Sequence, residues 1–193
     1  MLALMLLTTL FPVGRSTLRA SEATATTRGD ATGSLGITLW YPAAERSVAT
    51  EHVIGPPNDP LFDAGLWQEH AALATGRFPL IAFSHGTGGS ALQMAWFATG
   101  LAARGFIVVA VDHPGNSLDT YTPAGFGLWW LRPGDVSLAL STALADPTLG
   151  PAIDANRIGA AGFSLGGYTV LELGGARTDL KRFAGYCRRT HWK

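Results

Sequence analysis

Residues 160–169 read AAGFSLGGYT, and this stretch places Ser164 between Gly162 and Gly166. The pattern G-x-S-x-G is typical of a sharp turn from a strand into a helix, with the serine hydroxyl exposed at its tip. Side chains two residues before and after the serine would collide in such a turn, so both positions need glycine. An apolar segment, 157–163, precedes the serine and a helical pattern follows it. The sequence therefore predicts that Ser164 is a nucleophile at a strand-to-helix turn.

Strand-like and helical segments alternate from residue 79 onward. Apolar or β-branched runs occupy 79–84, 106–112 and 157–163, and helical spacing occupies 90–104, 134–146 and 164–175. Buried strands that alternate with helices form a parallel sheet with right-handed crossovers. A further strand is expected at 34–42, where apolar residues alternate with smaller or polar ones. The sequence predicts an α/β fold with a mostly parallel sheet and helices on both faces.

The polar, glycine-rich segments follow three of the expected strands. They read SHGTGG at 84–89, DHPGN at 112–116 and GFSLGG at 162–167. Ligands of such sheets bind beyond the carboxyl ends of the strands. The three segments are therefore expected to form one functional edge.

Two of these segments can supply an oxyanion hole. A serine that attacks a carbonyl needs two backbone N–H donors for the oxyanion, one after the nucleophile and one from an earlier glycine-rich loop. We predict the N–H groups of Leu165 and Thr87 in these roles. Gly86 is expected to line the site, His85 to order the loop, and His113 to line the site mouth.

Composition narrows the classes of function. The chain has 193 residues, 47% hydrophobic and 15% charged, which is typical of one globular domain. Its net charge is zero and no basic patch stands out, so a nucleic-acid partner is not expected. The single cysteine, Cys187, cannot form an internal disulfide, and no Cys/His cluster has zinc spacing. No metal and no cofactor is therefore expected.

Four segments together resemble the α/β-hydrolase superfamily, and within it predicted dienelactone-hydrolase-like proteins and platelet-activating-factor acetylhydrolases. They read LWYP at 39–42, FPLIAFSHGTGG at 78–89, RGFIVVAVDHPGN at 104–116 and IDANRIGAAGFSLGGYT at 153–169. The resemblance covers roughly residues 34–186 and implies a serine hydrolase for small carboxylic esters: short-chain esters, lactones or acetylated phospholipids. True dienelactone hydrolases have cysteine at the elbow, whereas this chain has Ser164. That difference favours ordinary ester chemistry.

The resemblance also predicts that the last strands are missing. In this fold the catalytic acid and histidine follow the serine along the chain, after later strands. The sequence shows no such strands, so we interpret it as a fragment that lacks the triad acid and His and leaves an open sheet edge. Two internal alternatives remain. His191 could act as the base and Asp179 as the acid, although Asp179 could equally cap a helix or pair with Arg177.

The N-terminal region differs in character from the rest. Residues 2–13 form an apolar run too short to span a bilayer but suited to a signal-peptide core, and Ala23-Thr24-Ala25 fits a cleavage site. No Lys or Arg precedes the run, which argues against a signal peptide. A buried strand or a misplaced start codon would also explain the apolar run. We interpret 1–25 as a candidate signal peptide, 26–33 as a linker and 34–193 as the N-terminal part of the hydrolase domain. Cleavage would imply export to the periplasm or the medium; otherwise the protein is cytoplasmic.

Two other functions remain open. Gly86-x-Gly88-x-x-Ala91 also satisfies a dinucleotide-binding pattern, and Asp112 ends the next strand where a ribose-binding acid would lie. That interpretation explains neither His85 nor the turn at Ser164. A non-catalytic binding protein on a hydrolase fold is the other alternative.

Overall fold

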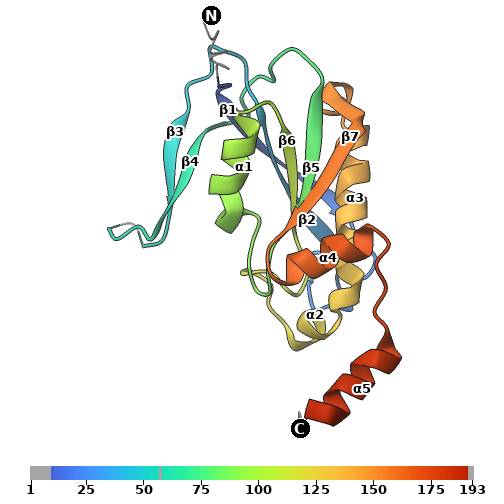
Figure 1. Ribbon diagram of the computed structural model, residues 1–193. Helices are drawn as coiled ribbons and strands as arrows, with labels where there is room; N and C mark the ends of the chain where they lie inside the picture. Colours follow the sequence, from blue (N-terminus) through green and yellow to red (C-terminus); the bar gives the residue numbers. More distant parts are fainter. Residues whose placement is uncertain (1–9, 57, 191–193) are drawn as a thin grey trace, which may run out of the picture.

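The computed structural model describes residues 10–56 and 58–190, and its strands form one sheet (Figure 1). The seven strands follow the order β3-β4-β1-β2-β6-β5-β7. Their bounds are β1 Val13–Ser21, β2 Ser34–Pro42, β3 Thr50–Ile54, β4 Phe62–Glu69, β5 Phe78–Ser84, β6 Ile107–Asp112 and β7 Ile153–Gly162. The helices are α1 Ala95–Ala102, α2 Pro123–Gly127, α3 Arg132–Ala145, α4 Leu165–Leu173 and α5 Leu180–Thr190, with 3-10 turns at Leu92–Met94, Trp129–Leu131 and Gly150–Ala152.

The functional half of the sheet is parallel, as the sequence predicts. β5 pairs in parallel with β6 on one side and with β7 on the other. β2 then pairs antiparallel with both β6 and β1. The carboxyl ends of β5, β6 and β7 therefore meet at one edge, where the three glycine-rich segments begin.

Helices cover both faces of the sheet, and each face has its own core. On one face Val136, Ala139 and Ala143 of α3 pack with apolar side chains of β2, β5 and β6. On the other face the alanines of α1 pack with Trp40 and Val108. Alternate residues of β6 enter opposite cores, which is why this strand is apolar throughout. The predicted α/β-hydrolase architecture is confirmed in these layers.

The region predicted as a linker is packed against the domain. Residues 26–33 form turns in which Arg28 and Asp30 are buried. The linker prediction is therefore wrong. Small polar residues suggested a solvated segment, but Arg28 finds carboxylate partners inside the protein.

Part of the candidate signal peptide is a strand in the structure. β1 pairs along its whole length with β2 and also contacts β4, so it lies inside the sheet. Removal of residues 1–25 would take away this strand. The buried-strand alternative concerns residues 2–13, and most of that run lies outside the described residues. Residues 1–9 lie outside the described residues, and cleavage stays a prediction. No helix within 10–56 and 58–190 is long and apolar enough to span a bilayer.

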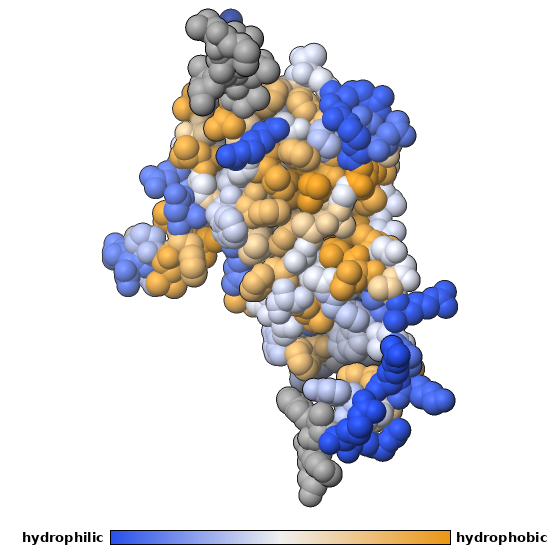
Figure 2. All heavy atoms as spheres, in the orientation of Figure 1, coloured by the Kyte–Doolittle hydropathy of each residue, from blue (hydrophilic) through white to orange (hydrophobic). Residues whose placement is uncertain are grey.

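The sheet ends at β7. Across the described ranges this strand pairs with β5 alone, so its other edge carries free backbone groups. Figure 2 shows apolar side chains gathered on the face along which β7 runs. The open edge that the sequence predicts is therefore present in this part of the chain.

Candidate active site

Ser164 lies in a strained turn between β7 and α4. Its backbone has φ 52° and ψ −117°, a left-handed φ that costs free energy in a non-glycine residue. A Cβ on Gly162 would overlap the carbonyl oxygen of Gly166, and a Cβ on Gly166 would overlap the carbonyl oxygen of Ser84. The close approach of these backbones therefore explains both glycines, as the motif predicts.

The Ser164 side chain is exposed, and its hydroxyl has no hydrogen-bond partner among the described residues. α4 begins at the next residue, Leu165, whose N–H likewise has no acceptor within the part of the chain that the structure describes. The first N–H groups of a helix point out of its end and carry partial positive charge. The turn thus combines an accessible hydroxyl with a free N–H donor.

The loop after β5 lies against this turn. A Cβ on Gly86 would be 3.3 Å from the Cβ of Ser164 and 3.1 Å from the Phe163 ring, so the two segments approach closely at this glycine. The Gly88 N–H donates to Asn116 Oδ1 at 2.9 Å, which fixes the loop. The N–H of Thr87 has no acceptor within residues 10–56 and 58–190. Its loop thus offers a second free donor beside Ser164.

His85 is buried under that loop. Its Nε2 lies 3.2 Å from the backbone nitrogen of His113 and accepts that N–H, so Nδ1 carries the proton and donates to the carbonyl of Gly86 at 2.6 Å. Burial, and then the proximity of His113, lowers the pKa of His85 to about 2. The ring is therefore neutral and braces the loop from inside.

The sequence predicts that His113 lines the site mouth, but in the structure it lies in the interior. Its side chain is fully buried. Nδ1 lies 2.7 Å from the Asp135 carboxylate, and Nε2 lies 2.8 Å from the Ser84 hydroxyl. Burial lowers the pKa of His113 to about 4, so the ring is neutral at pH 7. The prediction failed because the strand end at 112–113 turns inward, toward α3.

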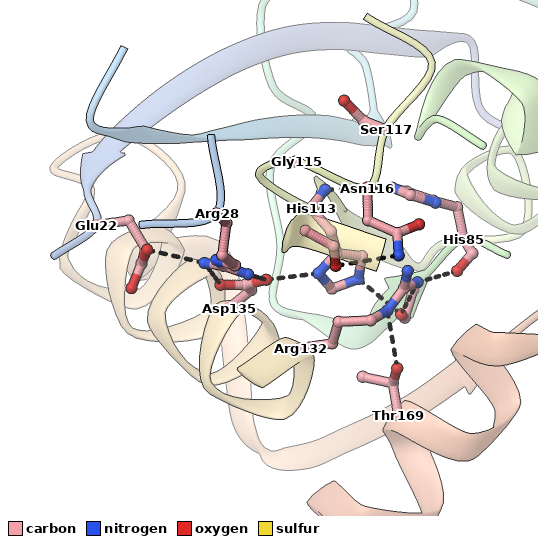
Figure 3. Close-up of polar contacts among 12 residues, drawn as sticks. Glu22, Arg28, His85, His113, Gly115, Asn116, Ser117, Arg132, Asp135 and Thr169 are labelled. Carbon is pink, nitrogen blue, oxygen red and sulfur yellow. Dashed lines mark hydrogen bonds and ion pairs between the residues drawn. The ribbon is translucent and has the colours of Figure 1, made fainter. Parts of the chain in front are cut away.

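A buried polar network connects these residues to α3 and to the N-terminal segment (Figure 3). Arg28 donates to both oxygens of Asp135, at 2.8 and 2.7 Å, and to Glu22 at 2.8 Å. Burial alone would raise the pKa of Asp135, but hydrogen bonds from Arg28 and His113 lower it overall. Arg28 and Asp135 therefore pair as buried charges of opposite sign, which limits the cost of desolvation.

The second arginine of the network is Arg132, at the start of α3. Its guanidinium donates to the Thr169 hydroxyl, to the Ser84 hydroxyl and to the carbonyl of His85. Sequence reasoning missed Arg132 and Asp135. The available signal was a pair of charged residues, three apart, at the start of an otherwise apolar helix.

Ser84, His113 and Asp135 form a buried serine–histidine–carboxylate array. It has the hydrogen-bond order of a catalytic triad. Its three side chains are at most 2% exposed, and Arg132 also donates to the Ser84 hydroxyl. A substrate carbonyl cannot reach Ser84, so this array holds the fold together beneath the exposed Ser164.

The remaining candidate residues lie elsewhere. Asp179 caps α5, since its Oδ1 accepts the N–H of Arg182 at 2.9 Å, so of its alternatives the helix cap is the one present. His191 lies outside the described residues. Asp112, which a dinucleotide site would need, accepts the N–H of Ala91 at 2.7 Å.

Comparison with known proteins agrees with this geometry. The family model of platelet-activating factor acetylhydrolase, isoform II, matches residues 34–123. The solved structure of a ferulic acid esterase from Streptomyces cinnamoneus superposes with a TM-score of 0.69 at 25% identity, over 86% of this chain and 56% of that one. The chain therefore has the α/β-hydrolase fold.

Curated relatives of this chain include proteins named as a cutinase and as a lipase. Cutinase est1 of Thermobifida alba is 33% identical over 103 residues, which cover 52% of this chain and 32% of the cutinase. Lipase 1 of Moraxella sp. is 31% identical over 89 residues, which cover 46% of this chain and 25% of the lipase. The matched region therefore covers about a third or less of the length of each of these relatives.

Proposed function

We propose that this α/β-hydrolase chain carries the nucleophile and the oxyanion-binding part of a carboxylic ester hydrolase. One observation carries the proposal: the exposed, strained Ser164 at the start of α4, with the loop 85–89 against it. Relatives named as a cutinase, a lipase and a ferulic acid esterase support the same chemistry.

In this mechanism Ser164 Oγ attacks the ester carbonyl carbon and the carbonyl oxygen becomes an oxyanion. The N–H groups of Thr87 and Leu165 donate to that oxyanion. The tetrahedral intermediate collapses, the bond to the leaving alkoxide breaks, and the acyl group stays on Ser164. Water then attacks the acyl-enzyme and releases the carboxylic acid. Removal of one oxyanion donor typically lowers the rate about 10²–10³-fold.

The proton of the Ser164 hydroxyl needs a base, which then returns it to the leaving alcohol. Neither His85 nor His113 can act, because both rings are buried and bonded to other groups. We propose that the base and its carboxylate lie outside the described residues, with His191 as one candidate. Esters with good leaving groups depend less on proton donation and react with Ser164 more readily than alkyl esters.

The proposed substrates are small-molecule carboxylic esters: short-chain esters, lactones or acetylated phospholipids. The match to an acetylhydrolase family over residues 34–123 supports acetyl esters within this class. Export of the protein is part of the same proposal and depends on processing of residues 1–25.

The proposal is tested with p-nitrophenyl acetate, whose leaving group needs no proton. The full chain is mixed with the ester, quenched in acid and digested, and the acetylated peptide is identified by mass. We expect release of p-nitrophenolate above the buffer rate together with acetyl on Ser164, and neither in Ser164→Ala. Ser137→Ala, which removes an exposed hydroxyl on α3, is the matched control and should behave as wild type. Acetylation of other residues alone would refute the proposal.

A further inference from the structure

A single buried side chain touches all the segments that build the proposed oxyanion site. Arg132 is 1% exposed and donates from Nη2 to the Ser84 hydroxyl at 3.2 Å and to the carbonyl of His85. Its Nε donates to the Thr169 hydroxyl, also at 3.2 Å. Ser84 ends β5, His85 begins the loop and Thr169 lies in α4. The planar guanidinium therefore bridges the loop and the helix (Figure 3).

These contacts lead directly to the two free N–H donors. The His85 carbonyl precedes Gly86 and Thr87 in the loop. On the other side, the Thr169 hydroxyl accepts from Arg132 and donates to the carbonyl of Leu165 at 3.1 Å. Leu165 supplies the second donor. Movement of the guanidinium would therefore shift both donors relative to Ser164.

The guanidinium of Arg132 stays charged although it is buried. Burial lowers its pKa to about 10, and the neighbouring Asp135 opposes that change, so the side chain stays charged at pH 7. Its Nη1 is buried without an acceptor among the described residues. An unpaired buried donor costs free energy, so Arg132 is not buried here to satisfy all of its own N–H groups. We attribute its position to the contacts that Nε and Nη2 make with α4 and the loop.

We propose that Arg132 is a positioning residue that fixes the spacing of the Thr87 and Leu165 N–H groups around Ser164. The inference rests on the proposed function, in which these groups bind the oxyanion. Arg132 does not touch the substrate. It acts through His85 on the loop and through Thr169 on the helix. A lysine cannot replace it, because one ammonium cannot reach three acceptors that a planar fork reaches together.

The test compares four variants of the full chain in their reaction with a fluorophosphonate. Arg132→Lys keeps the charge and loses the fork. Thr169→Val loses the hydroxyl, and Thr169→Ser restores it. Arg104→Lys is the control, because Arg104 is an exposed arginine just after α1 whose side chain donates to the carbonyl of Gly100.

We expect Arg132→Lys to lower the limiting labelling rate of Ser164 about tenfold, since small misplacements of reacting groups have such effects. The probe concentration at half the limiting rate should change less than twofold. Thr169→Val should lower the same rate, Thr169→Ser should recover it, and Arg104→Lys should match wild type. A folded Arg132→Lys that labels as wild type, or a Thr169→Val that labels as Thr169→Ser, would overturn the inference.

Amide hydrogen exchange separates this inference from the proposed function. Gly88 and Gly166 donate their N–H groups to Asn116 and to the carbonyl of Phe163, so both amides are protected in the folded chain. Even if wild type fails to label, which would refute the proposed function, Arg132→Lys should speed exchange at both sites. If Arg132→Lys leaves exchange unchanged at both amides, or speeds it at only one of them, the positioning role is refuted.

Discussion

At the scale of single residues, the turn at Ser164 depends on space that only glycine leaves. Gly162 and Gly166 face backbone oxygens that cannot move without displacing β5 or α4. The sequence motif was sufficient to predict both the turn and the reason for its glycines. It could not predict what lies beneath the turn, because the partners of His113 come from α3 and from the end of β5, each more than twenty residues away.

Gly166→Ala should destabilise the fold by about 3 kcal/mol, because the new Cβ would overlap the carbonyl oxygen of Ser84 and overpack the sheet edge. Gly134→Ala is the matched control. Gly134 is exposed in the first turn of α3 with nothing within 4 Å of a Cβ, and alanine should stabilise that helix by about 0.5–1 kcal/mol. Urea denaturation of both variants measures the change in the free energy of unfolding, which should be a decrease for Gly166→Ala and an increase for Gly134→Ala. Equal effects would contradict the proposed close approach.

The buried histidines predict a pH dependence of stability. The native pKa of His113 is about 4, below its ordinary value of 6.5, because the ring is buried. Between these values the unfolded chain binds a proton that the native chain refuses. The free energy of unfolding should therefore fall as pH drops from about 6.5 to 4, by about 1.4 kcal/mol per pH unit for this group. His85 adds a fall of the same sign.

Denaturation at pH 7, 6 and 5 tests this with His113→Gln, whose slope in that window should be shallower than that of wild type. His52→Gln is the control. His52 lies in β3, outside the buried network, and stacks on Trp67 of β4. Loss of the His52 ring should leave the contribution of His113 intact. A wild-type slope in His113→Gln would mean that His113 titrates normally in the native protein.

At the scale of elements, the sequence predicted β2 and the three strands that build the site, and it missed β1, β3 and β4. β5 and β6 are apolar because helices cover both faces, so periodicity and branching identified them. β7 is an edge strand with many exposed residues, and the sequence identified only the part from residue 157 onward. The segment from 43 to 77 contains the β3–β4 hairpin, which the sequence pattern does not identify. Its glycines and prolines imitate loop composition, and many of its side chains are exposed, which weakens the alternation that marks a strand.

The open edge of β7 should make the chain self-associate. Ile158 is 38% exposed in this edge strand, and no described strand pairs beyond it. Ile158→Lys places a charge that would be buried in any edge-to-edge pairing, and natural edge strands use lysine in this way. Sedimentation at increasing concentration should show less self-association than in wild type. Val48→Lys, at a residue 76% exposed in a loop, should change nothing; equal effects of both variants would argue against β7.

At the scale of the whole molecule, the N-terminal segment is tied to a helix more than a hundred residues later. Arg28 lies in turns that composition assigned to a linker, yet it forms a bidentate pair with Asp135. No local pattern could reveal this pair, because both residues look like ordinary surface charges in sequence. Their meeting depends on β1 and β2, which carry the segment across the sheet to α3.

Arg28→Met should therefore lower the free energy of unfolding by about 3–5 kcal/mol, because the Asp135 carboxylate would stay buried without its main partner. Thermal and urea unfolding measure the loss. Arg19→Met is the control, since Arg19 is exposed and bonds only the Ser34 hydroxyl, and it should cost little. A loss in Arg28→Met no larger than in the control would mean that the N-terminal segment is not part of the folded unit.

The nucleophilic role of Ser164 is tested most directly by a fluorophosphonate, whose fluoride leaves without a proton. The purified chain is labelled, weighed intact and mapped by peptide mass, beside Ser164→Ala and the urea-unfolded chain. The proposed mechanism predicts one adduct per folded chain, on Ser164, and none in the variant or the unfolded chain. A folded chain that forms no adduct, or an adduct that persists in Ser164→Ala, would contradict it.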